Sequence, residues 1–168
     1  MTNEAFARQV IAMQATLYRV SASILRQECD REDAVQNCIE RAWRKRGQLR
    51  DESRLHAWVT RILINECYAI LRDKRRMTPV EAVPDMPAPP SANPDLYRFF
   101  TGLSEKLRLP MVLYYVEGLN VAEIAQILRL PQGTVKTRLM RGRERMREDS
   151  YFQDIDLDAT HPEGGAGL

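Results

Sequence analysis

Apolar residues repeat at helical spacing in three stretches of the first 76 residues. The stretch DREDAVQNCIERAW begins at Asp30, a suitable N-cap residue, with Asp33 at the third helical position. Two further stripes contain Ala12, Ala15, Leu17, Val20, Ile24 and Leu25, and then Trp58, Ile62, Cys67 or Leu63, Ala69 and Ile70. Because residues three and four apart share a helix face, the pattern predicts three helices around one core.

A helix-turn-helix pattern lies near the other end of the chain, in GLNVAEIAQILRLPQGTVKTRLMRGRERM. Asn120 is a good N-cap, Glu123 completes a capping box, and Pro131 suits the first turn of a second helix. The apolar face of the first helix comprises Val121, Ile124, Ala125 and Leu128, and the stripe of the second comprises Val135, Leu139, Gly142 and Met146. The pattern predicts two short helices that pack against each other.

Prolines separate these two blocks. Six of them fall within MTPVEAVPDMPAPPSANPDL, which excludes a helix or a central strand and favours an extended polyproline conformation. We therefore predict an all-α protein of two small helical domains joined by a flexible Pro-rich linker. The predicted parts are a domain at 1–76, the linker at 77–95, the helix-turn-helix domain at 96–149 and a disordered acidic tail at 150–168.

Charge is informative only through its distribution, since 25 basic and 23 acidic residues leave a net charge of +2. The second helix of the helix-turn-helix is strongly basic. Its helical wheel turns Thr134, Thr137, Met140, Arg141 and Glu144 away from the apolar stripe, with Lys136, Arg138, Arg143 and Arg145 at the sides. Such a face suits DNA, because Arg binds guanine edges and other cations neutralise phosphates. The alternative is an ordinary solvated basic helix.

Several classes of protein are disfavoured by what the sequence lacks. The beginning of the chain does not resemble a signal peptide, and no apolar run reaches the roughly 18 residues of a membrane span. We expect a cytoplasmic protein without membrane insertion. Cys29, Cys38 and Cys67 show no metal-ligand spacing and are expected to be buried free thiols. His56 has no evident catalytic partner, so we expect no enzyme, no metal and no cofactor.

Two regions of the chain resemble one family. LSEKLRLPMVLYYVEGLNVAEIAQILRLPQGTVKTRLMRGRERMRE resembles the fourth conserved region of the extracytoplasmic-function (group IV) sigma factors of bacterial RNA polymerase, in the sigma-70 family. DREDAVQNCIERAW together with AWVTRILINECYAILRDKRR resembles the second conserved region of the same family. The resemblance covers about residues 10 to 147 and implies a subunit that binds core polymerase and directs promoter recognition and transcription initiation.

The resemblance also implies roles for individual residues. Contacts with the clamp helices of the largest polymerase subunit would involve Asp33, Gln36, Glu40 and Arg41. Asn65 would help to form a pocket for an unstacked base of the single-stranded minus-10 element, and the backbone there would meet Arg61, Arg72, Lys74, Arg75 and Arg76. In the duplex minus-35 element, bases would meet Lys136, Thr137, Met140 and Arg141, and phosphates would meet Arg138, Arg143 and Arg145. An anti-sigma factor is a further implied partner, and a stress or envelope-response regulon the implied target.

Three positions depart from the family pattern. Ala69 stands where Asp is frequent, Ile64 stands where a basic residue is frequent, and Arg129 occupies a turn position that is commonly Gly.

Four aromatic residues are expected to lie in the core: Trp43, Trp58, Tyr114 and Tyr115. An alternative function is an autonomous helix-turn-helix repressor or activator, whose first domain would sense a ligand or dimerise.

Overall fold

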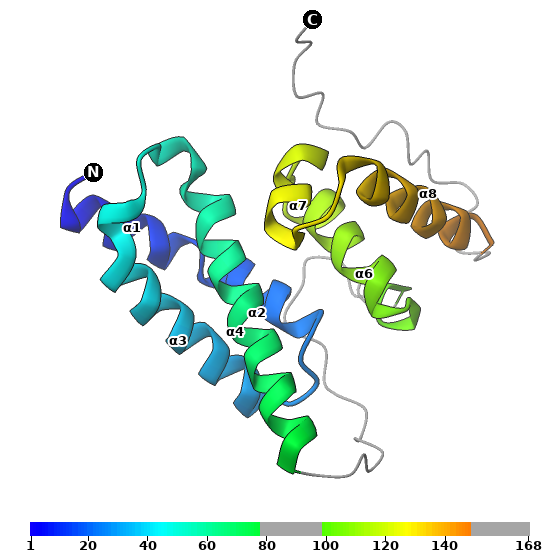
Figure 1. Ribbon diagram of the computed structural model, residues 1–168, viewed down its shortest axis with the longest axis horizontal. Helices are drawn as coiled ribbons and strands as arrows, with labels where there is room; N and C mark the ends of the chain where they lie inside the picture. Colours follow the sequence, from blue (N-terminus) through cyan, green and yellow to red (C-terminus); the bar gives the residue numbers. More distant parts are fainter. Residues whose placement is uncertain (78–98, 149–168) are drawn as a thin grey trace, which may run out of the picture. The chain divides into compact units, whose positions relative to one another are not determined.

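The computed structural model describes residues 1–77 and 99–148, and every regular element assigned there is a helix (Figure 1). The chain divides into two compact units, Met1–Ala92 and Asn93–Leu168. The predicted all-α class with two helical parts is confirmed. Apart from Met77, the predicted linker lies outside the described residues, as does the acidic tail. Within the part of the chain that is described, no helix combines the length and apolar character needed to cross a membrane.

Residues 1–77 of the first unit form four α-helices, one more than the sequence predicted. They are α1 (Asn3–Ala12), α2 (Gln14–Ala22), α3 (Glu28–Lys45) and α4 (Leu55–Met77), and the short 3-10 turns η1 (Arg46–Gln48) and η2 (Glu52–Arg54) connect the last two. The predicted stripe that starts at Ala12 is interrupted at Met13, between α1 and α2. Helix α1 contributes Phe6 and Val10 to the core, and α2 contributes Leu17 and Val20. Ala12 and Ala15, expected on the apolar stripe, are exposed.

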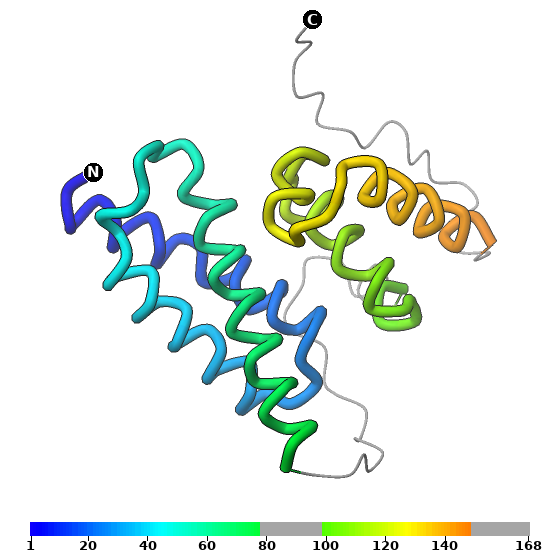
Figure 2. Tube along the Cα trace, viewed as in Figure 1, coloured from blue at the N-terminus to red at the C-terminus, as the bar shows by residue number. Residues whose placement is uncertain are grey.

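Helices α3 and α4 lie side by side and form the centre of this unit (Figure 2). Fully buried residues recur every four positions on both helices: Ala34, Cys38 and Ala42 on α3, and Val59, Leu63 and Cys67 on α4. The small side chains on α3 allow the two helix backbones to approach closely. Trp58, Ala69 and Ile70, predicted on the α4 stripe, are only half-buried.

The start of α3 differs from the prediction. Gln27 occupies the N-cap position, three residues before Asp30, and it makes no side-chain capping bond. Asp30 is buried in the first turn, where its carboxylate lies 2.6 Å from Lys74 Nζ of α4. Asp30 therefore pairs with the other helix and does not cap α3, and its partner Lys74 is 44 residues away in the sequence.

The second unit contains the helix-turn-helix. Residues 99–102 are helical, followed by α6 (Glu105–Met111), the π-helical segment η3 (Val112–Val116), α7 (Val121–Leu128) and α8 (Gln132–Glu148). The predicted capping box is present: Glu123 N–H donates to Asn120 Oδ1, and Asn120 N–H donates to Glu123 Oε2, both at 2.9 Å. The predicted stripe of α8 is buried as well. On α7, Ile127 is buried in addition to Ile124 and Ala125, whereas Val121 and Leu128 are half-buried.

Candidate nucleic-acid interface

The orientation of α8 is fixed by close packing against α6. Gly142 faces Met111, a fully buried residue, and a Cβ atom at position 142 would lie 2.5 Å from Met111 Sδ. Val135 and Leu139 are buried on the same side of α8. Since this side is occupied by the core, the opposite side of the helix is the one available to a partner.

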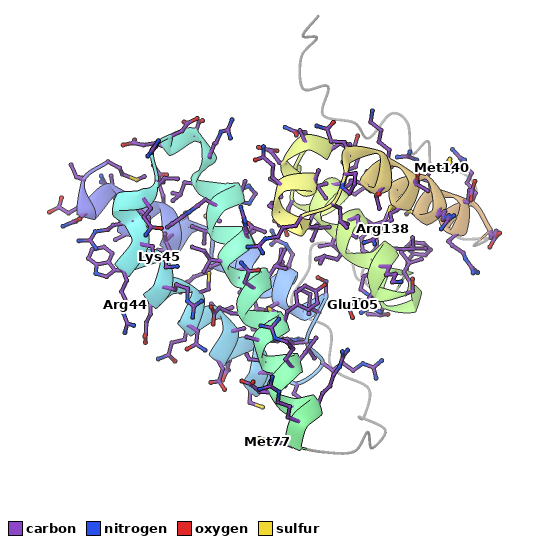
Figure 3. The ribbon with its side chains drawn as sticks, viewed as in Figure 1. Arg44, Lys45, Met77, Glu105, Arg138 and Met140 are labelled. Atoms are coloured by element: carbon purple, nitrogen blue, oxygen red, sulfur yellow. The ribbon has the colours of Figure 1, made fainter. Side chains whose placement is uncertain are left out.

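That outward side carries the predicted base-facing residues. Lys136, Thr137 and Arg141 are exposed, and Met140 is 48% exposed. Met140 and Arg138 lie on different sides of α8, as their spacing of two residues requires (Figure 3). The structure therefore brings together the residues predicted for the minus-35 element on one helix, with Arg138 and Arg143 half-buried at its sides.

Several of these side chains already have partners. Arg143 Nη1 donates to the hydroxyl of Tyr115 at 3.2 Å, and the Thr137 hydroxyl donates to Gly133 O at 2.9 Å. Arg145 lies 3.8 Å from the carboxylate of Glu148. Lys136 and Arg141 form no ion pair within the described residues. The charges of Lys136 and Arg141 are thus the most accessible ones on this face.

The balance of charge on α8 favours an anionic partner. The helix carries six basic residues and two acidic ones, Glu144 and Glu148. Cations near phosphates release the counterions that nucleic acid condenses, which drives binding regardless of sequence. The face of α8 therefore combines charge for the DNA backbone with side chains able to contact base edges.

The residues predicted to bind the minus-10 element are all on α4 but do not form one cluster. Asn65 is exposed and Arg61, one turn before it, is half-buried. The remaining members, Arg72, Lys74, Arg75 and Arg76, are exposed in the last turns of the helix. Asn65 and Arg76 are about 16 Å apart along the helix axis. A single nucleotide cannot contact both ends, so a strand would have to follow the helix.

Lys74 differs from its basic neighbours because its ammonium group is already bonded. It donates to Asp30 Oδ2 at 2.6 Å and also to Gln27 Oε1. These contacts hold the end of α4 against the start of α3. Lys74 therefore has a structural role in addition to the predicted one, and less of its charge is available to DNA.

The residues predicted to contact polymerase share one exposed face of α3. Asp33, Gln36, Glu40 and Arg41 are all exposed, at spacings that place them on neighbouring turns. Arg41 Nη1 also lies 3.0 Å from Glu66 Oε1 of α4. Glu66, which the sequence reasoning did not select, is a buried carboxylate beside Asn65. The available indication was its position three residues after Leu63 and directly before Cys67, which places an acidic side chain close to the apolar stripe.

The expectation that the aromatic residues are core residues is wrong for Trp43. Its side chain is 41% exposed, because it lies in the last turn of α3, beyond the packed centre. The Arg46 guanidinium lies over the indole, 4.2 Å from its centroid, and donates to Trp43 O and to Asn3 Oδ1. Trp58, Tyr114 and Tyr115 are half-buried.

The cysteines also divide into two kinds. Cys38 and Cys67 are buried, and burial raises the pKa of each thiol to about 12. Cys29 is exposed, contrary to expectation. In the described ranges, no three His, Cys, Asp or Glu side chains are grouped so that they could hold a metal ion.

A basic helix-turn-helix in one unit and a second helical unit with a basic helix define a class of DNA-binding protein built from two helical parts. Residues 10–77 match Sigma-70 region 2, and residues 95–146 match Sigma-70, region 4. The chain belongs to the extracytoplasmic-function sigma factors of the sigma-70 family.

Individual relatives agree with this assignment. The chain is 28% identical over 135 residues to the ECF RNA polymerase sigma factor SigM of Mycobacterium tuberculosis, covering 77% of this chain and 69% of the relative. It is 26% identical over 164 residues to the RNA polymerase sigma-E factor of Streptomyces coelicolor, covering 94% and 93%. Among solved structures, the sigma factor RpoE, in complex with the anti-sigma factor NepR from Bartonella quintana, superposes with a TM-score of 0.74. That match has 26% identity and covers 91% of this chain and 99% of that one.

Proposed function

We propose that this sigma factor reads the minus-35 duplex with the outward face of α8. Lys136, Thr137, Met140 and Arg141 contact base edges, and Arg138, Arg143 and Arg145 contact phosphates. The packing of Gly142 on Met111 carries this proposal, because it turns the apolar stripe inward and these side chains outward. A helix presented in this way fits the major groove.

Helix α4 then holds the single-stranded minus-10 element. Asn65 is exposed, and its amide both donates and accepts, so it can pair with the edge of an unstacked base. Arg61, Arg72, Arg75 and Arg76 supply charge along the path of the strand, with a smaller contribution from Lys74. The described contacts of Lys74 with Asp30 support that ranking.

Binding to core polymerase uses the exposed face of α3, through Asp33, Gln36, Glu40 and Arg41 against the clamp helices of the largest subunit. The charged and amide side chains on neighbouring turns suit a polar, directional contact. The division of contacts between two units joined by one chain makes the second contact intramolecular, so two weak sites together give useful affinity.

Regulation by an anti-sigma factor is part of the proposal. A solved structure to which this chain is similar, RpoE, was determined in complex with the anti-sigma factor NepR. A sigma factor acts on the chromosome, so we place the protein in the cytoplasm and assign it no catalytic step of its own. A stress or envelope-response regulon is the proposed target.

Transcription reconstituted from purified parts tests the function. Core polymerase and the full chain should yield promoter-dependent transcripts, whereas the chain alone should bind promoter duplex weakly. Failure to associate with core polymerase would exclude the sigma role. Tight and specific duplex binding by the chain alone would instead favour an autonomous helix-turn-helix regulator.

A further inference from the structure

Met140 is a large hydrophobic residue that is exposed on the surface of α8. Within residues 99–148 it is the one large hydrophobic residue that is exposed. A single exposed methionine is ordinary on a protein surface. Its position is informative here because it lies on the outward face of α8, next to Arg141 in the sequence and one turn after Lys136.

The hydroxyl of Thr137 is directed back onto its own helix. Thr137 Oγ1 donates to Gly133 O at 2.9 Å, which uses the single O–H donor of this side chain. The methyl group of Thr137 remains as the apolar part of an exposed residue. Positions 137 and 140 are neighbours on the helix surface, since they are three residues apart. The base-facing side of α8 therefore has a small apolar centre with Lys136 and Arg141 next to it.

Only one group on the base edges of the major groove matches an apolar contact. Guanine, adenine and cytosine present hydrogen-bond donors and acceptors there, whereas thymine adds a 5-methyl group. We propose that Met140, supported by the methyl group of Thr137, contacts the 5-methyl group of a thymine in the minus-35 element. The inference rests on the proposed function of α8 and adds the identity of a base and of the group recognised on it.

Removal of single methyl groups from DNA tests the contact. Holoenzyme formed from core polymerase and the full chain first selects its preferred minus-35 duplex from a library with randomised positions. Each thymine is then replaced by deoxyuridine, which lacks only the 5-methyl group. At one thymine, binding should weaken about fourfold, as expected for one buried methyl group. The Met140→Ala holoenzyme should bind thymine and deoxyuridine equally at that position.

Met140→Leu is the matched control, because leucine retains an apolar side chain and should still distinguish thymine from deoxyuridine. The contact is excluded if wild-type holoenzyme tolerates deoxyuridine at every thymine, or if Met140→Ala keeps the full deoxyuridine penalty. Selection of a preferred duplex together with either of those results overturns the thymine contact alone. A library that yields no preferred minus-35 duplex overturns the proposed function of α8 as well.

Discussion

Gly142 of α8 lies directly against Met111 of α6, so closely that a Cβ atom at position 142 would be 2.5 Å from the Met111 sulfur. Met111 is fully buried, so its side chain would have to shift within the core to make room for that atom. This contact sets the rotation of α8 about its own axis. The residues that face outward, and with them the proposed contacts to DNA, follow from it.

Gly142→Ala should therefore destabilise the second unit. Overpacking costs about 1–3 kcal/mol, and the gain in helix propensity offsets about 1 kcal/mol. Hydrogen exchange of α8 amides should show reduced protection. Gly133→Ala is the matched control, since nothing lies within 4 Å of a Cβ atom there. Equal behaviour of the two variants would contradict the packing argument.

Arg129→Gly should stabilise the turn between α7 and α8. Arg129 has a left-handed backbone with φ 55° and ψ 46°, which costs a non-glycine residue roughly 1–2 kcal/mol. Glycine removes this strain but is more flexible when unfolded, so a net gain of about 0.5–1 kcal/mol in unfolding free energy is expected. Gly118→Ala should have the opposite effect, since Gly118 has φ 69° and open space around it. A destabilised Arg129→Gly protein would contradict the argument.

Arg41→Ala should affect both stability and polymerase binding. Removal of the guanidinium leaves the buried Glu66 carboxylate without its 3.0 Å partner, at a cost of about 1–2 kcal/mol. Denaturant unfolding should show that Glu66→Gln in the Arg41→Ala background recovers part of the loss, because a neutral amide replaces the buried charge. Asp33→Ala should weaken association with core polymerase at unchanged stability. If the double variant regains polymerase binding along with stability, Arg41 does not contact polymerase directly and serves only to neutralise Glu66.

Two arginines of α8 should respond differently to replacement. Arg141→Ala should cost about 1–3 kcal/mol at one minus-35 base and relax preference there. Arg145→Ala should weaken binding to all sequences and lower the salt dependence by about one phosphate contact. Holoenzyme titrations over a range of salt concentrations distinguish these outcomes. A uniform loss with Arg141→Ala would make it a phosphate contact, and an unchanged salt slope would exclude Arg145 from one.

The stability of the first unit should fall in alkaline solution. Burial raises the pKa of Cys38 and Cys67 from 9.0 to about 12, so an unfolded chain releases these thiol protons before the folded one does. Below pH 9 the protonated thiols contribute fully to the unfolding free energy. As the pH rises toward 12 this contribution is lost, and each thiol lowers the unfolding free energy by up to about 1.4 kcal/mol per pH unit. Denaturant unfolding at pH 8 and pH 10 measures this loss of unfolding free energy. The Cys38→Ala protein should lose less between the two pH values, because one of the two thiols is absent.

The sequence determined the features that depend on a few neighbouring residues. The two helices of the helix-turn-helix, the Asn120–Glu123 capping box and the buried stripe of α8 were all predictable, because a helix face and a cap are defined within one or two turns. Gly142 was placed on that stripe for the same reason, whereas Pro131, predicted in the first turn, directly precedes α8. The family could be proposed because two such local patterns occur in order on one chain.

Only the tertiary structure decided which charged side chains are available to a partner. Lys74 is bonded to Asp30, Arg41 to Glu66 and Arg143 to Tyr115, and each pair joins segments distant in the sequence. Helical periodicity also did not predict the separate helix α1, the exposed Trp43 or the early start of α3, because these depend on how the helices pack. Helical periodicity fixes the face on which a residue lies, whereas the partner across that face is set by the packing of other helices.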